Sequence, residues 1–391
     1  MSAHLRHKAG SPPSMSEPVP DMSRRVFLKV PLAASALLMV PCSSGFAQDL
    51  LASGKAVSPE TEKALPPPAL AGWSMPSEQG PHQHCWMAWP ARKDIWERQL
   101  EEVRQEIARL AQTIAQYEPV TMLAEPDQVS EAQKLCGSSV SVLAMRVDDM
   151  WFRDSGPIFL TNGHGQIAGS TFNFNGWGNK QTHARDATVA EELLKHLGVT
   201  EFRAPFVTEG GAVETDGQGT LLVTQPSICN RNRNPGITRD QLTRYLCGWL
   251  GVSKVLWLPD SHPDYWTDGH VDGVARFCEP GAVLVDQSLP EVVEYLRQAT
   301  DAKNRKIKVI AVPPPSNLHS GGATSCNCYL NFYLANGAVI MPRLGDTQSD
   351  RRAQAIVREA YPQRQVVPIE LDTIASGGGL IHCVTQQEPA A

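Results

Sequence analysis

From residue 73 onward, the sequence alternates between short apolar runs and longer amphipathic stretches with helical spacing. Short strands that alternate with helices are typical of an α/β fold. Because no long linker interrupts this part of the chain, we expect it to form a single domain. The expected strands are residues 120–123, 140–147, 158–160, 221–223, 255–258, 282–285, 309–312, 329–333 and 339–341, and the expected helices lie near residues 186–197, 238–250, 290–304 and 350–361.

A further helix is expected after Asp94, whose carboxylate can accept hydrogen bonds from the free amides at a helix start. The apolar residues Val103, Ile107, Leu110 and Ile114 follow at helical spacing and fall on one stripe. This pattern predicts an amphipathic helix that Asp94 caps.

Polar motifs follow several of the expected strands, and they are spread along the chain from Asp154 to Cys383. A fold that gathers such strand ends at one point is a barrel or a propeller-like ring of sheets. The sequence shows no clear internal repeat, so a repeat in the fold is expected to be structural.

Residues 1–47 are interpreted as a twin-arginine export signal rather than as part of the fold. Arg24 and Arg25 precede an apolar stretch at residues 30–41. This stretch is too short to span a bilayer but has the length of the apolar region of a signal sequence. Cleavage is expected after Ala47.

Residues 48–71 are expected to form a linker, because three consecutive prolines at 66–68 stand among few apolar residues. The catalytic domain is then expected at residues 72–391. No other stretch of the sequence is apolar over the length of a membrane helix. We therefore expect a soluble periplasmic or secreted protein, with the twin-arginine export machinery as a partner.

The 35 basic and 41 acidic residues give a net charge of −6, and the isoelectric point is about 6.0. A protein that binds nucleic acid usually carries a basic surface, so this balance argues against nucleic acid as a partner. It suits a small cationic substrate.

A cysteine close to the C-terminus, Cys383, follows a glycine triplet at residues 377–379. Glycines have no Cβ, so this loop can approach a ligand closely and present the thiol to it. The aspartates Asp154 and Asp272 and a histidine between carboxylates, His270, complete a set of reactive residue types.

This set of residue types suits a guanidinium substrate. A guanidinium is planar and permanently charged, and two carboxylates that grip its edges would align its central carbon for attack. Cysteine is the expected nucleophile, because a cation held beside a thiol favours the thiolate. The bound substrate could itself supply that charge.

Each of these residues taken alone also has a structural interpretation. A single cysteine is usually buried core, Asp154 could pair with the neighbouring Arg153, and His270 could be a hydrogen-bonded core residue. Residues 232–235 are interpreted as a structural loop. His382 is left out of the site, because adjacent residues of a strand point to opposite faces.

Seven motifs are distributed between Trp73 and Gln387. They are residues 86–90, 151–157, 209–211, 232–235, 268–272, 331–337 and 377–383. Together these motifs resemble the agmatine deiminase family of the pentein superfamily, which includes the bacterial type of peptidylarginine deiminase. The resemblance implies a five-bladed α/β propeller of ββαβ units, with the active site on the central axis.

The resemblance also implies catalytic roles. Cys383 would be the nucleophile and His270 the general acid and base. Asp154 and Asp272 would hold the substrate guanidinium. Glu209 would pair with His270 and raise its pKa.

Two further residues, Trp151 and Asn331, are implied in substrate binding, by stacking on the guanidinium or its alkyl chain and by orienting it. The implied chemistry needs no metal or organic cofactor. Cys326 and Cys328 could ligate a metal, but no second pair of cysteines or histidines completes a zinc site.

Three functions remain open. The first is hydrolysis of agmatine to N-carbamoylputrescine and ammonia. The second is a peptidylarginine or arginine deiminase that forms citrulline, and Arg231 or Arg233 could then meet the carboxylate of free arginine. The third is a non-catalytic binder of guanidinium or polyamine ligands. A homo-oligomer also remains open.

Overall fold

The described residues of the computed structural model are 65–259, 266–316 and 326–391. The expected signal at residues 1–47 lies outside them, as does most of the expected linker at 48–71. Within the described part, no helix combines the length and the apolar character that crossing a membrane requires.

One order of strands recurs through the fold. Strand β4 (Ile158–Thr161) pairs antiparallel with β5 (Ile167–Thr171), and β5 pairs parallel with β6 (Thr200–Arg203). An antiparallel pair needs only a tight turn, whereas a parallel pair needs a long crossover. Helix α7 (Asp186–Leu197) provides that crossover and completes a ββαβ unit.

Three further sheets repeat this order along the chain, each with an antiparallel pair, a crossover helix and a parallel third strand. They are β7 (Val213–Thr215), β8 (Thr220–Thr224) and β9 (Lys254–Leu258) with α9 (Arg239–Leu250); β10 (Ala275–Glu279), β11 (Ala282–Asp286) and β12 (Lys308–Val312) with α10 (Pro290–Gln298); and β13 (Tyr333–Ala335), β14 (Ala338–Pro342) and β15 (Gln365–Ile369) with α11 (Thr347–Ala360).

The fifth sheet joins the first and the last strand that the structure describes. Strand β16 (Gln386–Pro389) pairs antiparallel with β1 (His82–Ala88), and β1 pairs parallel with β2 (Val120–Ala124) after helix α3 (Leu100–Ile114). Helix α4 (Val129–Cys136) then leads to an added parallel strand, β3 (Ser141–Ala144). The last strand of the chain thus supplies the first strand of this unit.

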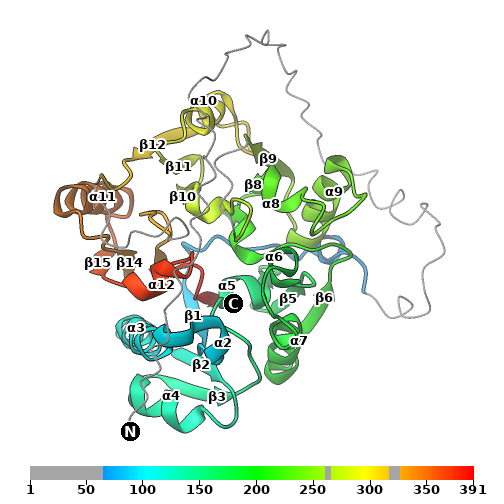
Figure 1. The fold of residues 1–391 in the computed structure, drawn as a ribbon. Coiled ribbons are helices and arrows are strands. Elements are labelled where there is room, and N and C mark those ends of the chain that lie inside the picture. The colour runs from blue at the N-terminus through cyan, green and yellow to red at the C-terminus, as the bar shows by residue number, and fades with distance from the viewer. Residues whose placement is uncertain (1–64, 260–265, 317–325) are drawn as a thin grey trace, which may run out of the picture. The chain divides into compact units, whose positions relative to one another are not determined.

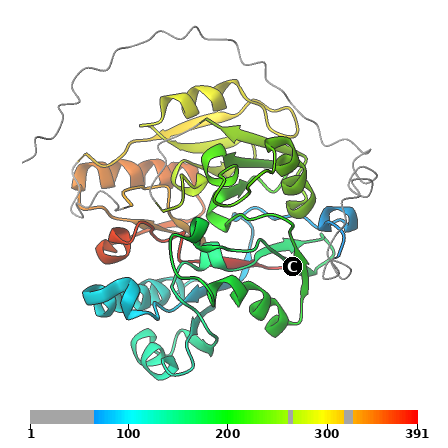
Figure 2. The same cartoon turned by 45° about the vertical axis from the view of Figure 1, so that its right-hand side comes forward.

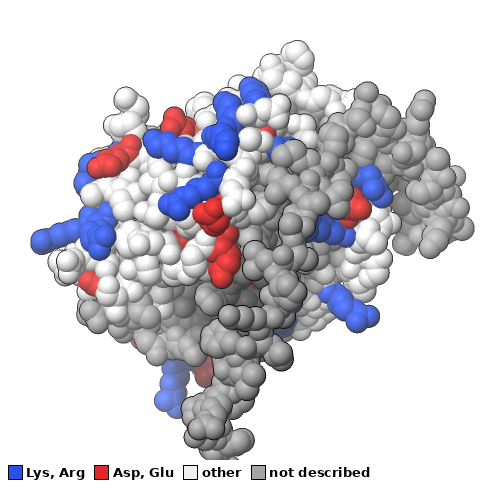
Figure 3. Space-filling view, turned by 90° about the horizontal axis from the view of Figure 1, so that it is seen from above, with Lys and Arg blue, Asp and Glu red and all other residues white. Residues whose placement is uncertain are grey.

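The five sheets follow one another around a common centre, and their crossover helices lie on the outer side (Figures 1 and 2). The α/β fold and the five ββαβ units that the resemblance implies are both present. On the face shown in Figure 3, the Lys and Arg side chains of described residues are interspersed with Asp and Glu side chains.

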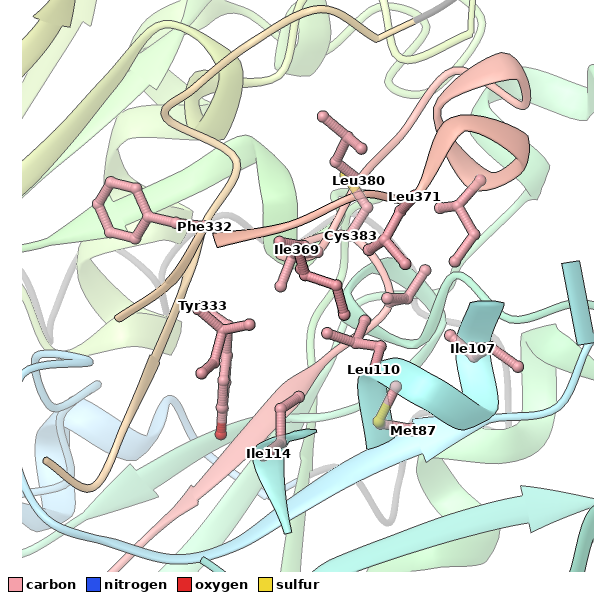
Figure 4. Close-up of a cluster of buried hydrophobic side chains, with 14 of the residues drawn as sticks. Met87, Ile107, Leu110, Ile114, Phe332, Tyr333, Ile369, Leu371, Leu380 and Cys383 are labelled. Atoms are coloured by element: carbon pink, nitrogen blue, oxygen red, sulfur yellow. The ribbon is translucent and has the colours of Figure 1, made fainter. Parts of the chain in front are cut away.

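Helix α3 packs its predicted apolar stripe into the core. Val103, Ile107, Leu110 and Ile114 are all fully buried, and Figure 4 shows Ile107, Leu110 and Ile114 in one cluster with Met87 of β1. Burial of such a side chain stabilises the fold by roughly 1.5–3 kcal/mol. This cluster extends to Cys383, so the predicted nucleophile lies at the edge of the core.

The expected cap at Asp94 was wrong. Helix α3 begins only at Leu100, and Asp94 lies in the short helix α2 (Lys93–Trp96), where it pairs with Arg92. The preceding 3-10 turn, η3 (Glu97–Gln99), separates the two helices.

Two other expected boundaries shift for identifiable reasons. Strand β13 starts at Tyr333 rather than at residue 329, because the carbonyls of Leu330 and Phe332 accept hydrogen bonds from Arg276 instead of a strand. Helix α10 ends at Gln298, because Thr300 leaves the helix to form a bridge with Lys306.

The end of the expected linker belongs to the described fold. Residues Pro68–Ala71 form a 3-10 turn, η2, against helix α9, and Pro68 is buried. Gly248 of α9 leaves room for this contact, because a Cβ there would lie 3.2 Å from the ring of Pro67.

Removal of residues 386–391 should abolish the cooperative folded state. The deletion takes away β16 and with it two buried hydrogen bonds, from Trp86 Nε1 to Glu388 at 2.8 Å and from Gln386 Nε2 to the carbonyl of Pro157 at 2.8 Å. Urea unfolding measures the effect, with deletion of the exposed Ala391 alone as the control. An unchanged midpoint for the longer deletion would show that the ring closes without β16.

Candidate active site

Six polar side chains stand just ahead of the first strand of a sheet, rather than after a strand as the sequence suggested. Each sheet directs the start of its first strand to the common centre, so these residues converge although they lie far apart in the sequence. They are Asp154 before β4, Glu209 before β7, His270 and Asp272 before β10, Asn331 before β13, and Cys383 before β16.

Cys383 lies in a turn at residues 381–384, next to Asn331 and Asp272. Its Sγ accepts a hydrogen bond from Asn331 Nδ2 at 3.1 Å and lies 3.7 Å from Asp272 Oδ2. Burial, together with the negative charges of Asp272 and Asp154, holds the pKa of the thiol well above its ordinary value. The thiol therefore needs a neighbouring cation to become an effective nucleophile.

The ring of His270 lies between two carboxylates. Nδ1 is 3.7 Å from Asp154 Oδ1, and Nε2 is 3.4 Å from Glu209 Oε2. Burial alone would lower the pKa of this imidazole, but the charges of Asp154, Glu209 and Asp272 outweigh it and raise the pKa to about 9. At neutral pH the ring is protonated and can donate a proton.

Neither nitrogen of the His270 ring makes a hydrogen bond within the part of the chain that the structure describes. Buried polar groups are nearly always paired in folded proteins. A buried ring with two unbonded nitrogens is therefore what we expect of a group that meets a ligand or water during the reaction.

Asp154 is held in place by two donors. Its Oδ2 accepts from Trp177 Nε1 at 2.9 Å, and its Oδ1 accepts from the amide of Gly211 at 3.0 Å. Burial raises the pKa of this carboxyl group. Trp177 reaches it from a left-handed backbone conformation, with φ of 55°, which is rare for a bulky residue and is typical of functional sites.

Glu209 is oriented by an arginine of the 232–235 loop. Both side chains are fully buried, and Arg233 Nε donates to Glu209 Oε1 at 2.7 Å. Burial opposes ionisation of Glu209, but the charge of Arg233 outweighs it and lowers the pKa. Arg233 also binds Asp268 Oδ2 at 2.6 Å, so it is not free to meet a substrate carboxylate.

The same loop keeps the structural role that its sequence suggested. Asn234 Nδ2 donates to the carbonyls of Val207 and Ile228, while Asn234 Oδ1 accepts from the amide of Val207. Arg231, the other arginine considered for the carboxylate of free arginine, is exposed.

The glycine triplet fits against two tryptophan rings. A Cβ on Gly377 would lie 2.5 Å from the ring of Trp96, and one on Gly379 would lie 2.4 Å from the ring of Trp151. Gly378 has a φ of 95°, a conformation that favours glycine. The triplet thus lets the loop lie flat on the aromatic wall beside Cys383.

A pocket with about 300 Å³ of space between protein atoms opens onto the thiol. Trp151, predicted to contact substrate, forms one wall of it. The other lining residues are Asp154, Trp177, Gln181, Trp266, Thr267, Gly377, Gly378, Gly379 and Cys383. None of these carries a positive charge, so the walls suit an alkyl chain and a cationic group.

The interpretation of His382 was wrong in its reason. This residue lies in a turn, not a strand, and its ring points to the site: Nδ1 is 2.8 Å from Asp272 Oδ2. It is not placed as a base for Cys383, because its other nitrogen lies 2.9 Å from Glu78 Oε1. The only sequence signal for His382 was its position next to Cys383. This segment was predicted to be a strand, whereas it forms a turn.

In the described ranges, no three His, Cys, Asp or Glu side chains are arranged to hold a metal ion. Cys328, which the sequence raised as a metal ligand, instead donates from Sγ to the carbonyl of Gly273 at 3.2 Å.

Comparison with known proteins identifies the family of the chain. The profile of the Porphyromonas-type peptidyl-arginine deiminase family matches residues 74–389. The chain belongs to this family.

Similar proteins of this family include agmatine deiminases. That of Stutzerimonas stutzeri is 36% identical over 358 residues, which is 83% of this chain and 97% of the relative, and that of Pseudomonas aeruginosa is 34% identical with the same coverage. The solved agmatine deiminase of Enterococcus faecalis superposes with a TM-score of 0.79 at 32% identity, over 86% of this chain and all of that one.

Substitution of Gly211 by alanine should lower kcat/KM by about 100-fold or more, since small misplacements of reacting groups are costly. The new Cβ would lie 2.6 Å from His270 Nδ1 and 3.0 Å from Asp154 Oδ1. Ammonia release from a guanidine substrate measures the effect. Gly273→Ala is the matched control, because no atom lies within 4 Å of its Cβ position. Equal activity of the two variants would contradict the packing described here.

The raised pKa of His270 should make the fold lose stability in alkali. The charged ring is favoured in the folded protein, so its contribution is complete below the ordinary pKa of about 6.5 and is lost as the pH rises through about 9. The loss should be on the order of 2–3 kcal/mol. Urea unfolding at pH 6 and pH 9.5 measures it, and His270→Gln should reduce the difference. An exposed-residue control, His164→Gln, should leave it unchanged.

Proposed function

We propose that this protein hydrolyses agmatine to N-carbamoylputrescine and ammonia. The observation that carries the proposal is a cysteine beside two buried aspartates, Asp154 and Asp272, in a pocket whose described walls hold no cation. The names of the similar proteins from Stutzerimonas stutzeri and Enterococcus faecalis point to the same substrate.

Substrate binding would place the guanidinium between Asp154 and Asp272. Each carboxylate accepts from one edge of the planar cation, and charge-assisted pairs of this kind fix its orientation. The rings of Trp151 and Trp177 stand in the same pocket wall and can pack on the cation or on its alkyl chain. Asn331, which bonds to both Asp272 and Cys383, keeps the thiol aligned with the bound group.

The first half-reaction would begin when the bound substrate adds a positive charge beside the Cys383 thiol. In the free protein the pKa of the Cys383 thiol is raised by burial and by the two aspartates, and a bound guanidinium offsets that negative charge. The thiol then releases its proton to solvent, and the resulting thiolate attacks the guanidinium carbon. His270 gives its proton to the departing nitrogen, the C–N bond breaks, and ammonia leaves a thiouronium on Cys383.

The second half-reaction would use the neutral ring of His270 as a base. It takes a proton from water, and the resulting oxygen nucleophile attacks the same carbon. The C–S bond breaks with its electron pair on Cys383 Sγ, the proton of the new hydroxyl group is lost, and the ureido product is released as a proton restores the resting thiol. Glu209 stabilises the protonated ring in both halves, because its carboxylate lies 3.4 Å from Nε2.

Agmatine is favoured over free arginine on electrostatic grounds. The carboxylate of arginine would enter a pocket whose described lining contains Asp154 and no Lys or Arg. Arg233 cannot compensate, since its donors are taken by Glu209 and Asp268. Agmatine carries no carboxylate.

An exported protein would meet peptides outside the cytoplasm, and this favours a second candidate, a peptidylarginine deiminase. We propose that residues 1–47 direct the protein through the twin-arginine machinery to the periplasm or the medium. In support, the family match begins only at residue 74, so the arginine pair at Arg24 and Arg25 lies ahead of the catalytic region.

A parallel assay decides between the candidates. Ammonia release is measured with agmatine, free arginine and a peptide with a blocked internal arginine, and Cys383→Ser serves as the inactive control. We expect kcat/KM to be highest for agmatine. A higher value for the peptide would replace the proposal by the peptidylarginine activity. No release from any of the three would favour a binding protein.

A further inference from the structure

The ring of His382 connects two buried carboxylates behind the active site. Nδ1 lies 2.8 Å from Asp272 Oδ2, and Nε2 lies 2.9 Å from Glu78 Oε1. The His382 side chain is fully buried. An ionised carboxylate can only accept hydrogen bonds, so a histidine bonded to two of them donates from both nitrogens and carries a positive charge.

Both carboxylates are favoured in the ionised form. Burial opposes the charge of Glu78, but Arg153, His382 and Arg276 outweigh it and hold the pKa well below its usual range. Burial also opposes the charge of Asp272, and the hydrogen bond and charge of His382 outweigh it and lower that pKa. A chain of alternating charges thus runs from the two arginines through Glu78 and His382 to Asp272.

The described hydrogen bonds to the Asp272 carboxylate all go to one of its two oxygens, Oδ2. Oδ2 accepts from His382 Nδ1 at 2.8 Å and from Asn331 Nδ2 at 3.2 Å. In the ranges that the structure describes, no side chain or amide donates to Oδ1. This arrangement fixes the rotation of the carboxylate and leaves its second oxygen for a ligand.

The backbone of His382 ties this contact to the nucleophile. Its amide donates to Asn331 Oδ1 at 3.0 Å, and its carbonyl accepts from Arg153 Nε at 3.3 Å. Because Cys383 follows directly in the chain, the groups that orient Asp272 also set the position of the thiol.

We propose that His382, supported by Glu78, is a positioning residue that keeps Asp272 ionised and correctly rotated to receive the substrate guanidinium. The inference rests on the proposed function, which assigns Asp272 to that cation. Such support is needed because Asp154 and Glu209 place two further carboxylates in the same buried site, and like charges at close range favour protonation of one of them.

The test compares two substitutions at His382. His382→Gln removes the charge and can donate to only one carboxylate, whereas His382→Lys restores a cation. In the Gln variant the pKa of Asp272 should rise, so the acid limb of kcat/KM should move to higher pH by about one unit or more. KM near neutral pH should rise about 10-fold, with a smaller change in kcat.

The Lys variant should return the acid limb at least part of the way to its position in the wild type. Equal shifts in the two variants, or no shift in the Gln variant, would overturn the proposal. KM does not depend on the fraction of protein that is folded. The acid limb is read after kcat/KM has been divided by the folded fraction at each pH, so that acid unfolding of a less stable variant is not taken for a shift.

His82→Gln is the matched control. His82 is also buried and also faces a carboxylate, with Nδ1 3.3 Å from Glu118 Oε1. Its Nε2 bonds to the backbone carbonyl of Glu78 at 3.0 Å, but it contacts neither the Glu78 carboxylate nor Asp272. It should lower stability and leave the acid limb in place.

The profiles are measured with the guanidine compound that the wild type deiminates best. If the wild type deiminates none, the proposed function fails, and the same pH shift is sought in agmatine binding by calorimetry. An unshifted binding curve for His382→Gln would then overturn this inference separately.

Discussion

Glu78 is the buried anion on which the centre of the molecule depends. It accepts from Arg153 at 3.0 Å, from Arg276 at 2.7 Å and from His382 at 2.9 Å, and these partners come from three different places in the ring of sheets. Arg276 in turn binds Glu214 at 2.8 Å. Loss of one partner from such a buried network leaves an uncompensated charge, which costs roughly 3–5 kcal/mol. The network therefore holds the loops of separate sheets in one arrangement.

In the Glu78 network, positive and negative charges are paired. In the neighbouring active site they are not balanced. Asp154, Asp272 and Glu209 surround His270, and their combined charge explains the protonated ring. Burial, together with the charges of Asp272 and Asp154, explains the resting thiol of Cys383. A substrate that brings its own positive charge supplies what the site lacks. The need for a positive charge on the substrate disfavours neutral amides, which the shape of the pocket alone would not exclude.

The chemistry of the site was more predictable from the sequence than its geometry. Residue type and loop composition made Cys383, His270 and the two aspartates candidates, and the structure brings them together. Their roles stay predictions from the family resemblance. His382 was misplaced because a turn was taken for a strand. Trp177 gave no signal, because only its unusual backbone conformation directs the indole to Asp154.

The strands also differ in how well the sequence predicted them. Apolar strands such as β8 and β11 were predicted almost to the residue, since burial on both faces leaves a continuous apolar run. The strands that were not predicted are β1, β5, β6, β7, β10, β15 and β16. Two of them, β6 and β16, are largely polar and show no continuous apolar run. The side chains of β16 are nevertheless buried, and their polar groups are accommodated by partners such as Trp86 that lie far away in sequence.

The position of Cys383 beside the closing strand also has a consequence for the synthesis of the protein. The sulfur and β16 are both synthesised after Asp154, His270 and Asp272, the groups proposed to act on a guanidinium. A nascent chain can therefore contain Asp154, His270 and Asp272 and still lack the atom that attacks. The order of translation alone keeps the chain without its proposed nucleophile until Cys383 has been added.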